Sequence, residues 1–177
     1  MSEPLCIHTG DSAAPREGFT LPVVIVLDRL RSAYNTGNIF RIAEAVRASR
    51  IIACGYTPCP PHDKLARTAR GCDGIVDCSH AESAAAAVSA LRCDGYTVYA
   101  VDTITNATLY SECRLRFPCA MLFGNEALGI SEEALALCDS AICLPACGLK
   151  NSINVGNCAA VALFEALRQF KGQMKHE

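Results

Sequence analysis

Three short stretches of the 177-residue sequence combine small polar residues, glycine and a few groups that could take part in chemistry. The first reads NTGNIFR over residues 35–41, and the second reads LFGNEALGIS over residues 122–131. The third reads LPACGLKNSINVGNCAA over residues 144–160. Each supplies an amide or hydroxyl side chain that can hydrogen-bond a ligand, and a glycine that lets a ligand approach the backbone.

The first stretch could bind an anion. Asn35 is a favoured helix N-cap residue, and Arg41 lies about one turn after Gly37. Because helical side chains lean toward the N-terminus, the guanidinium would reach back to the start of the helix, where backbone N–H groups attract anions. An arginine there could clamp a phosphate. Taken alone, the stretch also fits a capped helix with a surface arginine.

The other two stretches lie where a strand ends or a helix begins. A buried strand is expected to end at Gly124, which leaves Glu126 in an exposed turn, either solvated or facing a ligand. Ser152 or Asn154 is expected to cap the last helix. Gly156 inside that helix costs about 1 kcal/mol relative to alanine, which indicates close packing against another group.

Strand-like and helix-like segments alternate along the rest of the chain, which predicts an α/β fold with a mainly parallel sheet. In such sheets ligands bind at the carboxyl ends of the strands, where these stretches lie. The expected strands cover residues 21–27, 50–54, 74–77, 96–101, 118–123 and 141–145. The expected helices cover residues 35–48, 64–70, 81–92, 131–138 and 154–170, with the fourth opened by Ser131.

Length and composition fit one domain, expected over residues 19–171, with a flexible lead-in at 1–18 and a short tail at 172–177. No dinucleotide-binding or P-loop glycine motif follows any expected strand. No apolar run reaches the roughly 18 residues of a membrane helix, and no secretory signal is visible. The sequence therefore predicts a cytoplasmic protein that is not embedded in a membrane.

The chain has 12 cysteines, none in a C-x-x-C pair, so no zinc or other metal site is expected. Reduced, buried thiols are the main interpretation, with a redox role as the alternative. The net charge is −2, but the segment from Arg29 to Arg70 contains eight basic and two acidic residues. Such a segment can either form a phosphate-binding face or consist of scattered solvated arginines.

Together, in this order and spacing, the three stretches resemble the motifs of the SpoU/TrmH family of RNA 2′-O-ribose methyltransferases, within the SPOUT superfamily. Asn35, Gly37 and Arg41 match its first motif, and FGNEALG matches its second. Pro145, Gly148 and SINV match the third. The resemblance extends from about residue 21 to residue 170. One departure is the Gly156–Asn157 pair, where the family usually has a small or serine-like residue and then an apolar one.

The resemblance implies an α/β fold with a deep C-terminal trefoil knot, a homodimer, S-adenosylmethionine as cofactor and no metal. The last helix and the first motif would lie near the dimer interface. The residues implied to contact the cofactor are Val101, Asp102, Thr103, Leu122, Gly124, Ile142, Leu144, Ser152 and Ile153.

The implied reaction is methyl transfer to a ribose 2′-hydroxyl of RNA, with tRNA as the first candidate and rRNA as the second. The implied catalytic residues are Arg41, Asn35, Glu126, Ser152 and Asn154, with Arg41 acting either as a base or as a clamp on phosphate or ribose. The candidate RNA-binding residues are Arg29, Arg31, Arg41, Lys64, Arg67 and Arg70. The alternatives are a non-catalytic RNA-binding protein on the same fold, and a base methyltransferase, which Arg41 disfavours.

Overall fold

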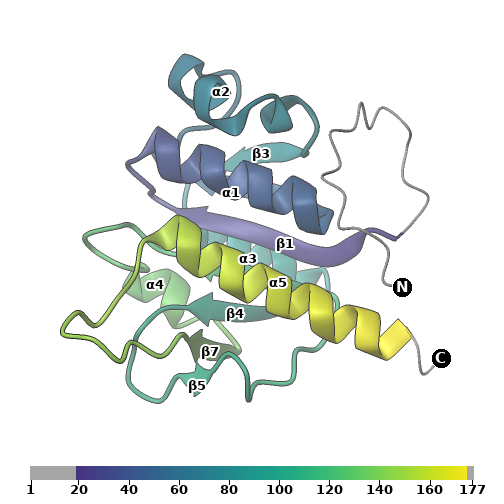
Figure 1. Ribbon diagram of the computed structural model, residues 1–177, viewed down its shortest axis with the longest axis vertical. Helices are drawn as coiled ribbons and strands as arrows, with labels where there is room; N and C mark the ends of the chain where they lie inside the picture. The colour runs from purple at the N-terminus through teal and green to yellow at the C-terminus, as the bar shows by residue number, and fades with distance from the viewer. Residues whose placement is uncertain (1–18, 175–177) are drawn as a thin grey trace, which may run out of the picture.

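The computed structural model describes residues 19–174. It contains a seven-stranded sheet of order β3-β2-β1-β6-β4-β7-β5 in which every neighbouring pair is parallel, so the predicted fold class is confirmed (Figure 1). The elements are β1 (Leu21–Asp28), α1 (Ala33–Val46), β2 (Ala48–Cys54), α2 (Asp63–Ala69), the 3-10 helix η1 (Cys72–Gly74), β3 (Cys78–Ala81), α3 (Ala84–Cys93), β4 (Thr97–Val101), β5 (Thr108–Leu109), β6 (Cys119–Phe123), α4 (Glu132–Leu135), β7 (Ser140–Cys143) and α5 (Val155–Met174).

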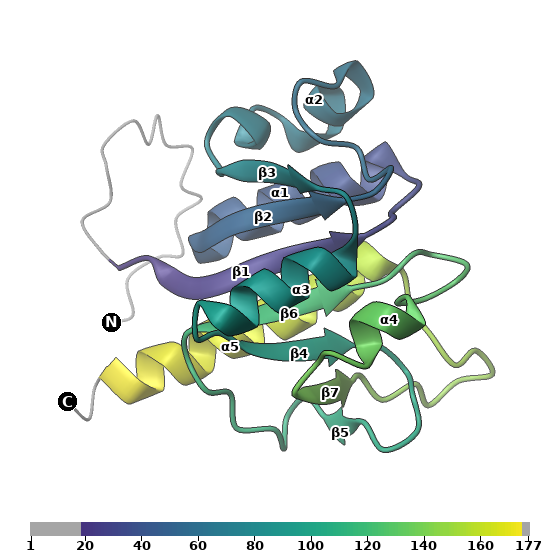
Figure 2. The same cartoon turned by 180° about the vertical axis from the view of Figure 1, so that it is seen from behind.

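Helices cover both faces of the sheet. Helices α1 and α5 lie on one face, and α3 and α4 lie on the other (Figures 1 and 2). The continuous apolar run of β1 contributes to the cores on both faces of the sheet. Ile25 and Leu27 pack in the core beneath α1 and α5, whereas Val24 and Val26 pack in the core beneath α3. This two-sided burial explains why the central strands are apolar at consecutive positions instead of alternating.

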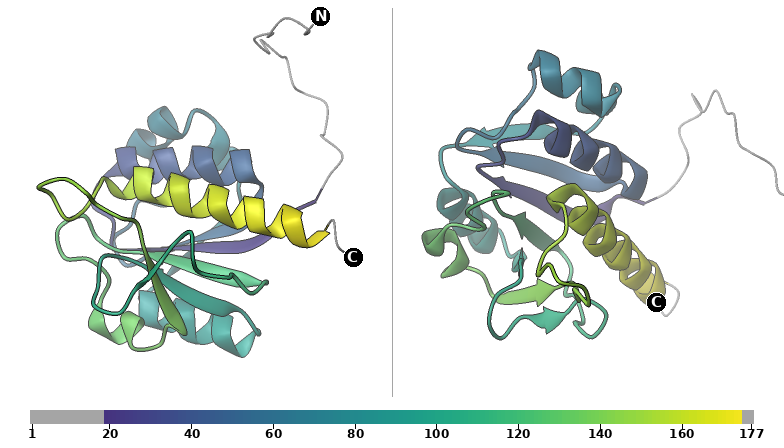
Figure 3. Two further views of the ribbon diagram at one scale, coloured as in Figure 1. Left: turned by 60° about the horizontal axis from the view of Figure 1, so that its bottom comes forward. Right: turned by 60° about the vertical axis from the view of Figure 1, so that its left-hand side comes forward.

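Strand β6 lies between β1 and β4, although it follows both in the sequence. The chain first builds β2 and β3 on one side of β1, then places β4, β7 and β5 on the far side of β6. The carboxyl ends of β1, β6 and β4 therefore meet at the place where the strand order reverses, which is the usual position of a ligand site in such sheets. Figure 3 shows α1 and α5 side by side above the same part of the sheet.

The structure corrects several element boundaries. Helix α1 begins at Ala33 with Ser32 as its N-cap, and the Ser32 hydroxyl accepts a hydrogen bond from Asn35 N, so the prediction that Asn35 is the cap is wrong. Helix α4 covers only Glu132–Leu135, and the Ser131 side chain makes no capping bond. The strand expected at 74–77 is β3, shifted to Cys78–Ala81, and β5 was not anticipated. Helix α5 continues past Phe170 to Met174.

Three expectations stay predictions: the lead-in, the end of the tail and the trefoil knot. The expected lead-in at residues 1–18 and the last three residues of the expected tail lie outside the described range. The trefoil knot stays a prediction. Within residues 19–174, no helix is both long enough and apolar enough to cross a membrane.

Candidate active site at the carboxyl edge of the sheet

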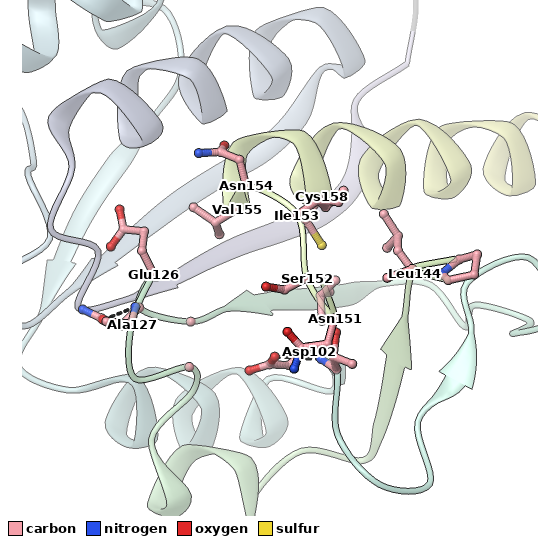
Figure 4. Close-up of a pocket in the computed structure, with 17 residues that line it drawn as sticks. Asp102, Glu126, Ala127, Leu144, Asn151, Ser152, Ile153, Asn154, Val155 and Cys158 are labelled. Atoms are coloured by element: carbon pink, nitrogen blue, oxygen red, sulfur yellow. Dashed lines mark hydrogen bonds between the residues drawn. The ribbon is translucent and has the colours of Figure 1, made fainter. Parts of the chain in front are cut away.

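A cavity of about 550 Å³ lies at the carboxyl edge of the sheet, within the size range of small-molecule sites. Its walls come from the end of β4, the segment after β6 and the segment between β7 and α5 (Figure 4). Seven of the residues expected to contact a cofactor line it, namely Val101, Asp102, Thr103, Gly124, Leu144, Ser152 and Ile153. The second and third sequence motifs therefore lie on one cavity.

Two of the expected cofactor residues do not line the cavity. The side chain of Leu122 is buried in the core beneath α3 and α4, and that of Ile142 is buried in the core beneath α1 and α5. Both belong to strands whose side chains pack into the interior. A contact between their backbone and a cofactor stays a prediction.

A chain of hydrogen bonds connects the three motifs. The Asn35 side-chain amide donates to Oε1 of Glu126 over 2.9 Å, and its oxygen accepts from Nδ2 of Asn154 over 3.0 Å. The Asn154 oxygen in turn accepts from Gly156 N over 2.9 Å, which caps α5. Figure 4 shows Glu126 and Asn154 on the side of the cavity that faces α1. Asn35 is therefore the buried link between one residue of the second motif and one of the third.

Glu126 is held as a carboxylate. Besides Asn35, its oxygens accept from the backbone N–H groups of Arg31 (3.0 Å) and Ser32 (3.2 Å). Partial burial raises the pKa of this carboxyl, but the hydrogen bonds from Arg31, Asn35 and Ser32 outweigh burial and leave the pKa below its usual value. A carboxylate that accepts three hydrogen bonds and has a lowered pKa is a weak base. Glu126 is therefore better suited to holding neighbouring groups in place than to accepting a proton.

Gly156 is explained by close packing between α5 and α1. A Cβ at this position would lie 2.7 Å from Nδ2 of Asn38 on α1 and 3.2 Å from Oδ1 of Asn154. The close packing predicted from the sequence is thus confirmed, and the other group is the neighbouring helix. Nothing in the structure explains Asn157, which is exposed.

Two residues that the sequence analysis missed fix the segment after β6. Asp28, only 1% exposed at the end of β1, accepts from Ser131 N over 2.7 Å. Asn125 accepts from the N–H groups of Ala127 and Leu128, and its amide donates to the carbonyl of Arg29. A carboxylate at the end of a buried strand was the signal that could have identified Asp28.

Gly124 marks a close backbone contact in the same segment. A Cβ there would overlap the backbone of Gly129 and Ile130, so no larger residue fits without moving the turn. The turn is also closed by two backbone hydrogen bonds between Asn125 and Gly129. The cavity wall that carries Glu126 is therefore a rigid turn.

The structure does not bring Arg41 into the cavity of its own chain. Arg41 is exposed on α1, beside Cys72 of η1. Burial raises the pKa of the Cys72 thiol, and the positive charge of Arg41 opposes that shift. The other basic candidates lie on the surface as well: Arg31, Lys64, Arg67 and Arg70 are exposed, whereas Arg29 is paired with Asp28 at 2.9 Å.

The cysteines of the described residues are free thiols. Burial raises the pKa of Cys54 and of Cys119 to about 12, so both remain protonated inside the sheet. Within residues 19–174, no group of three or more His, Cys, Asp or Glu side chains could hold a metal ion. Among the cysteines of the described residues, Cys158 alone lines the cavity, and burial raises the pKa of its thiol to about 11.

The SpoU rRNA Methylase family model matches residues 22–164. A tRNA (guanosine(18)-2′-O)-methyltransferase of Escherichia coli strain K12 is 30% identical over 147 residues, which cover 83% of this chain and 63% of the relative. An enzyme with the same description from Thermus thermophilus is 51% identical over 75 residues, covering 42% of this chain and 39% of the relative. The matches thus span less than two thirds of these relatives.

Solved structures share the fold. The SpoU methyltransferase AviRb from Streptomyces viridochromogenes, in complex with the cofactor AdoMet, is 27% identical with a TM-score of 0.75, over 84% of this chain and 57% of that chain. A structure described as giving insights into the 2-OH methylation of C/U34 on tRNA is 29% identical with a TM-score of 0.76, over 85% of this chain and 97% of that chain. From its family match and from these relatives, this chain belongs to the SpoU rRNA Methylase family.

Proposed function

We propose that the protein transfers a methyl group from S-adenosylmethionine to a ribose 2′-hydroxyl of RNA. The observation that carries this proposal is the hydrogen-bonded chain Glu126–Asn35–Asn154 beside the cavity. It joins polar residues from three distant motifs at the place where ligands bind in this class of sheet. The descriptions of related enzymes as RNA 2′-O-methyltransferases support the same reaction.

The cavity suits S-adenosylmethionine in size and chemistry. The Asp102 carboxylate matches a positively charged ligand, while Val101, Leu144 and Ile153 offer apolar contacts. Gly124 and Gly129 also line the cavity, and the absence of a Cβ at Gly124 lets the turn pack closely beside it. When bound, this cofactor supplies a methyl group on a positively charged sulfonium. The residues that would hold it are Val101, Asp102, Thr103, Gly124, Leu144, Ser152 and Ile153.

The remaining residues would orient the ribose. A 2′-hydroxyl is a poor nucleophile and must lose its proton as it attacks. Because Glu126 accepts three hydrogen bonds and has a lowered pKa, we assign Glu126, Asn35 and Asn154 to positioning. We assign Arg41 to clamping an RNA phosphate, because a guanidinium stays protonated in proteins. Ser152, exposed at the cavity wall, would contact the cofactor or the ribose.

The RNA would lie across α1 and α2. Arg31 and Arg41 are exposed near the start and middle of α1, and Lys64, Arg67 and Arg70 are exposed on or just after α2. Helices α1 and α2 pack against each other, so the segments that carry these cations are neighbours (Figure 1). Arg29 pairs with Asp28 through Nε, and its two terminal nitrogens would contact phosphate. We place tRNA first and rRNA second as the substrate.

The active form would be a homodimer. Helix α5 exposes Val161 (36%) and Phe164 (51%) one turn apart, and α5 packs beside α1, which carries Arg41. A partner docked on this surface would bury both apolar side chains and bring a second α1 near the cavity. A cytoplasmic location is part of the same proposal.

The test is incubation of the protein with radiolabelled S-adenosylmethionine and either unmodified tRNA or unmodified rRNA. We expect label on ribose in tRNA, and an Asn154→Ala variant should lose most of the transfer. Label on a base would contradict the assigned reaction. RNA binding without any label would favour a non-catalytic RNA-binding protein.

A further inference from the structure

Tyr56 is an aromatic side chain that is both fixed and exposed. It lies just after β2, and 57% of its surface is open to solvent. Its hydroxyl accepts a hydrogen bond of 3.0 Å from Nδ2 of Asn125, the residue before Glu126. The phenol is therefore tied to the turn that forms one wall of the cavity. No role in the core accounts for a ring in this position.

The backbone around Tyr56 is held on both sides. Gly55 N donates to the carbonyl of Ala81 over 3.0 Å. The hydroxyl of Thr57, a buried residue, donates to the Leu27 carbonyl over 3.1 Å and accepts from Leu30 N over 2.9 Å. Because these bonds fix the segment before any ligand arrives, a partner that binds the ring need not supply the cost of ordering it.

Positive charge lies beside the ring. The Arg29 side chain passes so close to Gly55 that a Cβ there would lie 3.0 Å from its Cγ. Arg31 is exposed, and its backbone N–H is bonded to Glu126. A second exposed ring, Tyr34 (70%), immediately precedes Asn35 in the first turn of α1. Aromatic rings among arginines, at the rim of a polar site, are the surface chemistry that binds unpaired nucleotides.

We propose that the Tyr56 ring stacks on an unpaired base of the substrate RNA, beside the ribose positioned by Glu126, Asn35 and Asn154. The inference rests on the proposed function and narrows it to RNA in which the methylated nucleotide lies in a loop or another single-stranded region. Bases stacked within a helix cannot offer a face to a protein side chain, whereas unpaired bases can. Phosphates flanking that base would face Arg29 and Arg31.

The test compares full-length variants at Tyr56 with a variant of Tyr96, a half-buried tyrosine elsewhere in the fold. Tyr56→Leu removes the ring, and Tyr56→Phe keeps the ring but loses the hydroxyl bonded to Asn125. Tyr96→Leu is the control, because Tyr96 lies just before β4 at the opposite, amino edge of the sheet. The probes are a short oligouridylate and its abasic analogue, which has the same number of phosphates but no bases.

Stacking predicts that only binding of the base-containing probe depends on the ring. We expect Tyr56→Leu to weaken oligouridylate binding by roughly five- to 150-fold while leaving the abasic probe unchanged. Tyr56→Phe and Tyr96→Leu should bind both probes like the wild type. The inference would be overturned if Tyr56→Leu weakened both probes equally, or if Tyr56→Phe lost as much affinity as Tyr56→Leu.

Two further readouts separate the possible failures. A change in oligomeric state of Tyr56→Leu, measured by light scattering, would assign the ring to a subunit contact and overturn the inference. If the wild type methylates unmodified tRNA and Tyr56→Leu keeps the wild-type KM, stacking is refuted while the proposed function stands. If the wild type transfers no methyl group but the probe difference holds, the stacking surface stands and the reaction is refuted.

Discussion

At the scale of single residues, Asn35 determines how the site is assembled. Its amide donates to a carboxylate 91 positions away and its oxygen accepts from an amide 119 positions away. The position requires a side chain that donates on one side and accepts on the other, and the planar amide of asparagine does both. Asn35 therefore holds the cavity turn and the start of α5 in a fixed relation.

Glu126→Gln should lower stability in a pH-dependent way. Glutamine offers one acceptor oxygen and an NH₂ group to three donors, so we expect a loss of about 1 kcal/mol in the free energy of unfolding at pH 7. The folded-state pKa of Glu126 lies below its ordinary value of 4.5, so its contribution is complete above that pH. As pH falls through the folded pKa, the contribution is lost.

Urea unfolding across pH checks this expectation. The difference between wild type and Glu126→Gln should shrink toward zero in acid, whereas the exposed Glu112→Gln control should stay within about 0.5 kcal/mol throughout. A difference that is the same at every pH would show that the charge of Glu126 is not what stabilises the turn.

Arg41→Ala should abolish methyl transfer while leaving cofactor affinity intact. Arg41 is exposed on α1 and does not line the cavity, so its removal leaves the proposed cofactor site unchanged. Calorimetric titration with S-adenosylmethionine and a transfer assay give the two readouts. Arg114→Ala, at an exposed position between β5 and β6, is the matched control and should keep both. Equal loss of cofactor binding and transfer in Arg41→Ala would contradict the clamp assignment.

At the scale of elements, the contact between α1 and α2 depends on Gly37. A Cβ there would overlap Oγ1 of Thr68 and lie 2.8 Å from the backbone N of Ala69, which no side-chain rotation can relieve. Gly37→Ala should therefore cost about 1–3 kcal/mol and lower the Tm. Gly172→Ala, on α5 with open space around it, should cause no loss. Equal Tm values for the two variants would show that α1 and α2 can move apart to accept a Cβ without loss of stability, which would contradict the expected role of Gly37.

The sequence predicted the interior elements well and the edges poorly. Strands β1 and β6 are continuous apolar runs, which burial on both faces requires. The N-cap of α1 was misplaced because Ser32 and Asn35 are both good caps, and only the fold shows that the Asn35 side chain is used elsewhere. The edge strands β3 and β5 are short, and their pairing depends on neighbouring strands that local patterns do not reveal.

The sequence named residues that the structure brings together at the cavity, but it also named Arg41, which lies outside the cavity, and it did not show how the residues are connected. The resemblance implied that Asn35, Glu126 and Asn154 belong to one site. Their hydrogen bonds join residues far apart in sequence and depend on β6 lying between β1 and β4. Asp28 and Asn125 were missed because their hydrogen bonds hold the turn after β6, which local sequence patterns do not reveal. Such supporting roles become visible only when the strand ends are placed in space.

At the scale of the whole molecule, the proposed dimer depends on the exposed face of α5. Phe164→Glu would place a charge in a contact between two apolar surfaces, so we expect a monomer where the wild type is a dimer. Light scattering measures the mass of each form. The control is Ile75→Glu, which changes an equally apolar exposed residue beside η1 and should leave the dimer intact. A monomeric wild type would refute the dimer directly.

The central claim is that this cavity and its hydrogen-bonded rim methylate a ribose 2′-hydroxyl. The most direct measurement is alkaline hydrolysis of unmodified tRNA after incubation with the protein and S-adenosylmethionine, because a 2′-O-methyl group removes the nucleophile that alkaline cleavage requires. We predict one phosphodiester that becomes resistant to alkali, next to an unpaired nucleotide, and no resistance with Asn35→Ala. Methyl groups on a base, with every phosphodiester still cleaved, would contradict the account.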